Sequence, residues 1–76
     1  MRTLNTIAQE VENDWGEKVN FAARPYLEAM HYLKKVDDYF GAESGRSVVA
    51  YFLSNATGWR GEKARKIKKE LNSMIK

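Results

Sequence analysis

The chain has no cysteine, one histidine and one proline in 76 residues. Without cysteine, neither a disulfide framework nor a thiolate metal site can stabilise this small fold, and such usage is typical of cytosolic proteins. Because His31 is the only imidazole, a nucleophile–base pair or a transition-metal site would have to be assembled from scattered carboxylates and hydroxyls. We therefore expect a non-enzymatic protein without a cofactor or metal, in which His31 is a structural residue at the surface or partly buried.

Long hydrophobic runs are also missing. The N-terminal segment MRTLNTIAQEVENDW carries acidic side chains where a signal peptide requires an apolar stretch, and no window approaches the length of a membrane span. With 43% hydrophobic residues the composition is that of a folded globule, and a chain this short supports one hydrophobic core. The prediction is a single domain over residues 1–76 that is soluble and cytoplasmic and has no membrane partner.

Apolar side chains recur at three- and four-residue intervals over residues 4–14 and again from Pro25 onward, and this pattern predicts two helices. Pro25 suits the first turn of a helix because its missing N–H would be unpaired there. Gly16 and Gly41 are the expected stops. The side chains expected to be buried are Leu4, Ile7, Ala8, Val11 and Trp15 in the first helix and Tyr26, Leu27, Met30, Leu33, Val36 and Phe40 in the second.

Two further helices are predicted in the second half. Ser44 is a suitable N-cap for a third helix, whose strongly apolar sequence indicates a central position, and NATG at 55–58 separates it from a last helix over about residues 59–75. The result is an all-α fold of four helices without a strand, whose last pair resembles a helix-turn-helix. The side chains expected to be buried are Val48, Val49, Phe52, Leu53, Ala56, Ala64, Ile67, Leu71, Met74 and Ile75.

Two local patterns resemble ligand sites but have the wrong spacing. GAESGRS at 41–47 has three residues between its glycines and then an arginine, whereas the Walker phosphate loop needs four residues and a lysine after a strand. We interpret it as a helix stop followed by an N-cap turn. A second group of carboxylates matches no calcium loop, so a solvated helix face is favoured over a weak divalent-ion site. This group comprises Glu10, Glu12, Asp14 and Glu17.

Positive charge gathers at the C-terminal end. Residues 58–76 hold seven Lys and Arg against two carboxylates, a balance of +5, whereas the preceding residues have a balance of −2. Clustered cations on a helix gain affinity for nucleic acid by displacing counterions from its phosphates. The leading prediction is a small accessory or regulatory protein that binds nucleic acid, and the alternative for these residues is a solvated helix back without a ligand. The candidate residues are Arg60, Lys63, Arg65, Lys66, Lys68 and Lys69.

The nucleic-acid interpretation depends on where carboxylates lie in the fold. It weakens if Glu62 and Glu70 neutralise the basic helix, or if Asp37 and Asp38 fold over it. The start of the last helix also has few side chains suited to base recognition, because Arg60 is the one residue there of a type that commonly hydrogen-bonds to base edges.

Aromatic residues favour a function of another class. Tyr and Trp are enriched at binding hot spots, so rings left exposed would mark a protein partner or a self-association face. Most large rings must fill so small a core, which leaves Tyr32, Tyr51 and Trp59 as surface candidates. The alternative function is therefore a protein-interaction module that uses Trp59 and Tyr51. It binds either another protein or a second copy of itself as a dimer.

The segments PYLEAM at 25–30 and YFLSNATGWRGEKARKIKKEL at 51–71 resemble small uncharacterised helical proteins encoded by bacteriophages and prophages. That family has no assigned activity or catalytic residues, so the resemblance transfers no site. It implies a bacterial cytoplasmic setting, in which small helical proteins act as DNA-binding regulators or as inhibitors of host proteins. Nucleic acid and a host or phage protein are accordingly the two expected partners.

Overall fold

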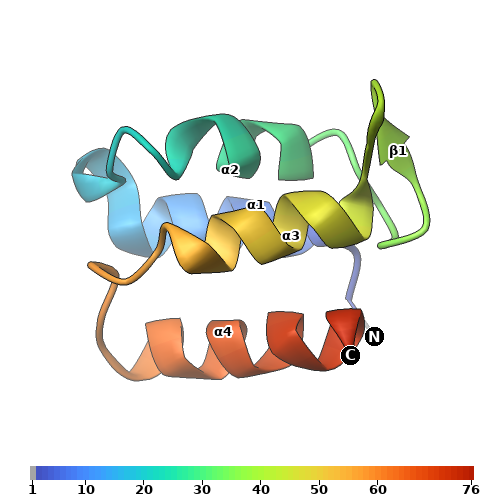
Figure 1. The fold of residues 1–76 in the computed structure, drawn as a ribbon. Helices are drawn as coiled ribbons and strands as arrows, with labels where there is room; N and C mark the ends of the chain where they lie inside the picture. Colours follow the sequence, from blue (N-terminus) through green and yellow to red (C-terminus); the bar gives the residue numbers. More distant parts are fainter. Residues whose placement is uncertain (1) are drawn as a thin grey trace.

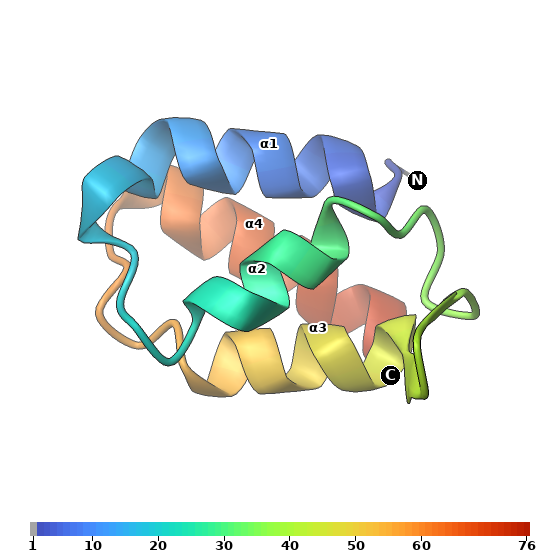
Figure 2. The same cartoon turned by 90° about the horizontal axis from the view of Figure 1, so that it is seen from above.

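Four α-helices and a minimal β-hairpin make up residues 2–76, the part of the chain that the computed structural model describes. In chain order the elements are α1 (Leu4–Trp15), the 3-10 turn η1 (Gly16–Lys18), α2 (Arg24–Met30), β1 (Tyr39–Phe40), β2 (Glu43–Ser44), α3 (Gly45–Ser54) and α4 (Glu62–Ile75). α2 and α4 each pack against both α1 and α3. Figure 1 shows α1 and α3 at a level between α2 and α4, and Figure 2 shows α2 above the space between α1 and α3. The central position predicted for the third helix is thus shared with α1.

One hydrophobic cluster joins side chains from all four α-helices. Every side chain predicted to be buried in α1 lies in it, and so do Val48, Val49 and Phe52 of α3. On α4 the predicted stripe is confirmed, with Ile75 half-buried at its edge. The 3.6-residue period of these segments therefore identified the correct faces. Within residues 2–76, no helix combines the length and apolar character needed to cross a membrane.

The second helix is shorter than predicted, because it ends at Met30 and does not continue to Phe40. Beyond it, the Asp38 carboxylate accepts hydrogen bonds from the backbone N–H groups of Lys34 and Lys35 at 3.1 and 3.0 Å. Such side-chain acceptors compete with the helical hydrogen-bond ladder. Leu33 is buried as expected, whereas Val36 is only half-buried and Phe40 is 44% exposed, which corrects the assignment of Phe40 to the core.

A hairpin with two residues in each strand lies where no strand was predicted. Tyr39 pairs with Ser44 and Phe40 with Glu43 in antiparallel register. The hairpin leads directly into α3, where the Ser44 side chain accepts a hydrogen bond from the Ser47 N–H at 3.1 Å. The predicted N-cap is therefore confirmed, and the expectation of a strand-free fold is wrong only for this short pairing.

The last helix begins at Glu62, three residues later than predicted. Gly61 precedes it with φ 113°, in the region that favours glycine, so the backbone turns sharply between Arg60 and α4. Trp59 and Arg60 therefore lie in the α3–α4 connection, residues 55–61, and not on the helix. This displacement decides the shape of the candidate site.

Candidate functional site

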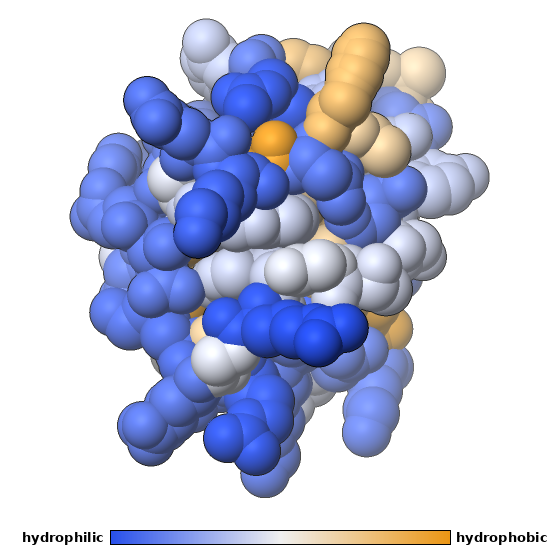
Figure 3. Space-filling view, turned by 90° about the vertical axis from the view of Figure 1, so that its left-hand side faces the viewer, coloured by the Kyte–Doolittle hydropathy of each residue, from blue (hydrophilic) through white to orange (hydrophobic). Residues whose placement is uncertain are grey.

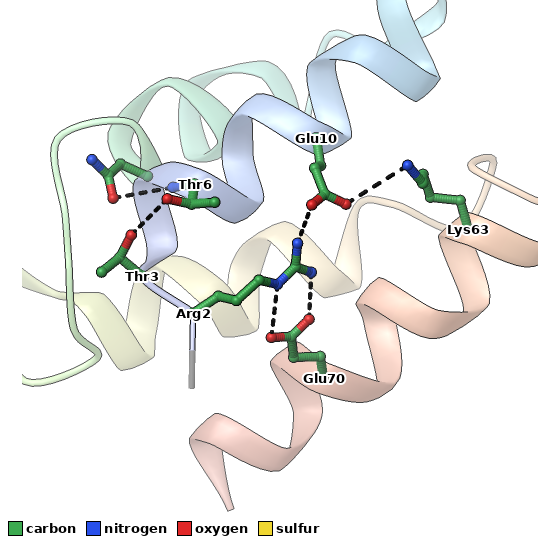
Figure 4. A network of polar contacts seen from close by, with 7 residues as sticks. Arg2, Thr3, Thr6, Glu10, Lys63 and Glu70 are labelled. Atoms are coloured by element: carbon green, nitrogen blue, oxygen red, sulfur yellow. Dashed lines mark hydrogen bonds and ion pairs between the residues drawn. The ribbon is translucent and has the colours of Figure 1, made fainter.

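An ion-pair network on one side of α4 determines which charges of this helix remain available. The Arg2 guanidinium lies between α1 and α4, where its Nε and Nη2 donate to Glu70 at 3.2 and 2.5 Å and its Nη1 donates to Glu10 (Figure 4). These contacts, with Glu70 foremost, raise the pKa of Arg2. Lys63 Nζ lies 3.7 Å from the same Glu10. Glu70 is thus turned toward α1, and Lys63 is the one predicted binding residue that belongs to an ion pair within residues 2–76.

The outer face of α4 presents three cations. Arg65, Lys66 and Lys69 are exposed, and no ion pair of the described residues includes them. On a helix, residues 65 and 69 are neighbours one turn apart, with 66 beside them. The carboxylates of this helix are Glu70, which follows Lys69 and is paired with Arg2, and Glu62, which lies in the first turn. We name Arg65, Lys66 and Lys69 the basic outer face.

The acidic residues that could have covered this face are elsewhere. Asp38 is bound to the backbone of the loop after α2. No hydrogen bond or ion pair in the described part of the chain joins Asp37 or Asp38 to α4. Asp37 and Asp38 therefore do not cover the basic helix, and Glu70 is paired with Arg2. Glu62 lies in the first turn of α4, three residues before Arg65, and no ion pair of the described residues includes it.

Lys68 differs from the other predicted binding residues because it is half-buried. Its Nζ donates to the backbone carbonyl of Trp59 at 2.6 Å and lies 5.9 Å from the centre of the Trp59 ring. Burial lowers the pKa of Lys68, and the nearby Arg60 guanidinium lowers it further. This lysine therefore ties the α3–α4 connection to α4 while adding positive charge beside it.

Trp59 is a core residue, and its predicted exposure is wrong. Only 2% of its surface is accessible, because the ring stacks on Trp15 with centroids 5.7 Å apart and meets Phe52 edge-on at 6.5 Å. Its Nε1 donates to Asp14 at 2.9 Å. A buried indole of this kind needs both a flat partner and an acceptor. The stacked Trp15 and the acceptor Asp14 lie on α1, so no local pattern around residue 59 could have indicated them.

Two surface cavities flank the Trp59 segment. One, of about 290 Å³, is lined by Thr57, Trp59, Arg60, Gly61, Ala64, Arg65 and Lys68. The other, of about 350 Å³, is lined by Asp14, Trp15, Lys18, Asn20, Gly58, Trp59 and Arg60. Figure 3 views the end of the molecule that lies at the left of Figure 1, and hydrophilic side chains cover most of it. We name the first cavity the basic pocket; sequence reasoning identified its cations but not their convergence, which depends on the turn at Gly61.

Exposed aromatic rings lie away from α4. Tyr32 and Tyr51 are exposed as predicted, at 77% and 49%, and Tyr32 lies 5.6 Å from the Phe40 ring. Tyr51 on α3 stacks against Tyr26 on α2 with ring centroids 5.3 Å apart. The other large exposed rings are Phe21 and Tyr39.

His31 and the N-terminal carboxylates form no metal site. His31 is half-buried, and its Nε2 lies 3.3 Å from Glu12 without the geometry of a hydrogen bond. No cluster of three or more metal-ligating side chains occurs among residues 2–76. Two of the four carboxylates have structural partners, since Glu10 pairs with Arg2 and Asp14 accepts the Trp59 indole.

Comparison with models of protein families, with curated proteins and with solved structures finds no match. The resemblance to phage-encoded proteins therefore stays a prediction, and the function has to be argued from the chain itself.

Proposed function

We propose that this protein is a non-enzymatic nucleic-acid-binding protein that contacts phosphates through the basic outer face of α4, assisted by Arg60. One observation carries the proposal: Arg65, Lys66 and Lys69 are exposed together without a paired carboxylate, while Glu70 is turned away to Arg2. Unpaired, hydrated cations on one face are suited to replacing the counterions of a polyanion.

The contact we propose is to the backbone, with little reading of sequence. Two polar side chains that follow the cations on α4 are occupied, since Asn72 donates to the Lys68 carbonyl at 2.9 Å and Ser73 to the Lys69 carbonyl at 3.2 Å. Phosphate contacts fix a protein on a duplex without carrying sequence information. The expected binding is therefore sequence-tolerant and strongly dependent on salt.

The helix-turn-helix-like use of the last two helices stays a prediction. α3 and α4 run in opposite directions in Figure 1 and are joined by residues 55–61. The proposal needs only the long side of α4 against the phosphates. Of the six residues predicted from the sequence, we assign smaller roles to Lys63, which is paired with Glu10, and to Lys68, which is half-buried.

The test is fluorescence anisotropy of labelled duplex DNA and duplex RNA at low and near-physiological salt. Lys66→Glu/Lys69→Glu should abolish measurable binding. In Lys66→Gln/Lys69→Gln the affinity should fall less steeply with salt, so that the negative slope of log affinity against log salt becomes smaller in magnitude by about 2, one for each lost phosphate contact. The matched control is Lys34→Glu/Lys35→Glu, which changes the net charge equally at exposed positions of the loop after α2. Absence of binding by the unmodified protein, or equal loss in both charge-reversed variants, would reject the basic outer face as the interface.

A second candidate function is protein recognition through the exposed rings of the α2–α3 side. The observation that favours it is the exposure of Tyr32 and Tyr51, each next to another aromatic ring. Self-association is its most direct form, and sedimentation over a wide concentration range tests it. Tyr32→Ala and Tyr51→Ala should each abolish the dimer, and the affinity of the unmodified dimer should depend little on salt. A protein that is monomeric at all concentrations would contradict self-association.

A further inference from the structure

The basic pocket combines three cationic side chains within one surface cavity. Arg60, Arg65 and Lys68 all line it, and no ion pair of residues 2–76 includes any of them. Asp14 lines the neighbouring cavity, where it accepts the Trp59 indole, and Glu62 lines neither of the two. The pocket therefore holds three cations with no carboxylate in its lining, and Glu62 lies nearby in the first turn of α4.

Backbone N–H groups at the start of α4 add to this charge. The first intrahelical hydrogen bond runs from the Arg65 N–H to the Gly61 carbonyl at 3.0 Å, so the N–H groups of residues 62–64 have no acceptor within the helix. Gly61 occupies the N-cap position and provides no side-chain cap. Of the three residues with a free N–H group, Ala64 lines the pocket, and so does Gly61 before the helix. A helix start in this condition carries a partial positive charge and uncommitted donors.

Lys68 is held in a position to use its remaining donors. One of the three ammonium protons is engaged with the Trp59 carbonyl, which fixes the side chain beside the indole. Burial and the neighbouring Arg60 both disfavour its charged form, as the lowered pKa indicates. An anion that enters the pocket would offset both effects.

We propose that the basic pocket is a binding site for one phosphate group, held by Arg60, Arg65 and Lys68 with the free N–H group of Ala64. Its volume of about 290 Å³ accommodates a tetrahedral anion with part of its hydration. The inference deepens the proposed function, because a nucleic-acid phosphate is one source of this group and a free phosphate is the other. The site itself stands on its lining residues and is separate from Lys66 and Lys69.

The experiment is a titration of the isotope-labelled full chain with inorganic phosphate at constant ionic strength, followed by amide and indole NMR shifts. Saturable shifts are expected at the Gly61 and Ala64 amides and at the Trp59 indole. Arg60→Gln/Arg65→Gln should weaken phosphate binding about tenfold or more, because charge-assisted hydrogen bonds are lost. The control Lys66→Gln/Lys69→Gln removes the same charge outside the pocket. It should weaken phosphate binding less than about twofold, since water and salt screen the interaction between these two lysines and a phosphate in the pocket. Absence of saturable shifts, or equal weakening in both variants, would overturn the phosphate site.

Labelled duplexes with and without a 5′-phosphate separate the two sources. A preference for the phosphorylated duplex that disappears in Arg60→Gln/Arg65→Gln assigns the pocket to a nucleic-acid end. Equal binding of both duplexes, with the inorganic phosphate shifts retained, assigns it to a free phosphate or an internal one. Loss of duplex binding by the unmodified protein with retained phosphate shifts contradicts the proposed function alone, and the reverse result contradicts the pocket alone.

Discussion

Two connections of the molecule differ in whether their aromatic side chains are buried: residues 31–44 between α2 and α3, and residues 55–61 between α3 and α4. The first leaves Tyr32, Tyr39 and Phe40 exposed. The second buries Trp59 almost completely, against α1 and α3. Both connections occupy residues that the hydrophobic pattern assigned in part to helices.

The difference follows from what each connection needs to be stable. In residues 31–44 the backbone groups are satisfied locally, by Asp38 and by the hairpin, and the start of α3 adds hydrogen bonds from Gly45 to the Asp38 carbonyl and from Arg46 to the Val36 carbonyl. The rings there are not needed to complete the core. Residues 55–61 are held by the buried Trp59 ring together with hydrogen bonds from other parts of the chain, of Asn20 to the Asn55 carbonyl and of Lys68 to the Trp59 carbonyl. This arrangement brings the adjacent Arg60 to the basic pocket.

The largest expected effect is the loss of stability when the buried Trp59 is replaced. Trp59→Ala removes the stack on Trp15, the contact with Phe52 and the hydrogen bond to Asp14, and should lower the free energy of unfolding by about 3–5 kcal/mol. Chemical denaturation measures it. The matched substitution in the other connection, Tyr39→Ala, should stay within about 0.5 kcal/mol, because the ring is 69% exposed. Similar losses for the two variants would show that the contrast between the connections is false.

A smaller effect is expected where residues 31–44 meet α3. A Cβ at Gly45 would lie 2.7 Å from the Lys35 carbonyl oxygen and 2.9 Å from the Val36 Cα, so Gly45→Ala should cost about 1–3 kcal/mol through overpacking against backbone. Gly58→Ala is the control in residues 55–61, since its Cβ would meet no atom within 4 Å and should change stability by less than about 1 kcal/mol. Thermal unfolding of both variants compares them, and an unchanged melting temperature for Gly45→Ala would exclude the close approach.

The smallest effect concerns Asp38. The backbone N–H groups of Lys35 and Lys34 lower the pKa of Asp38 below its ordinary value of 3.8. A carboxyl whose pKa is lowered by folding contributes stability above its unfolded pKa and loses this contribution as the pH falls through the folded value. The melting temperature of the unmodified protein should therefore fall more steeply below about pH 4 than that of Asp38→Asn. Asp37→Asn, at an exposed neighbour, should keep the steeper slope; a flat profile in the unmodified protein would contradict the role of Asp38.

The local sequence pattern was sufficient to predict the buried side chains wherever a helix packs along one face. The stripe from Leu4 to Trp15, the Ser44 cap and the buried face of α4 all follow from short-range spacing, because period and capping act within one or two turns. The exposure of Arg65, Lys66 and Lys69 follows from the same period, as these residues lie opposite the buried stripe. The basic outer face was therefore predictable residue by residue.

Contacts between residues far apart in the chain decided the rest. The segment after α2 is held by the local bonds of Asp38 and also by hydrogen bonds that link residues 34–38 to the starts of α1 and α3, which the hydrophobic pattern does not indicate. Trp59 could not be assigned to the core without Trp15, which lies on another helix. The pairing of Glu70 with Arg2 spans 68 positions, yet it determines which charges on α4 remain free.

By itself the sequence determined a mostly helical fold, the buried faces of its helices and the excess of positive charge on the last one, because these depend on composition and on periodicity along one helix. The tertiary structure alone decided that Trp59 is buried, that Glu70 turns away from the basic outer face and that Arg60, Arg65 and Lys68 line one pocket. The physical reason is that burial and charge compensation depend on distance in space, which is fixed only when the helices pack.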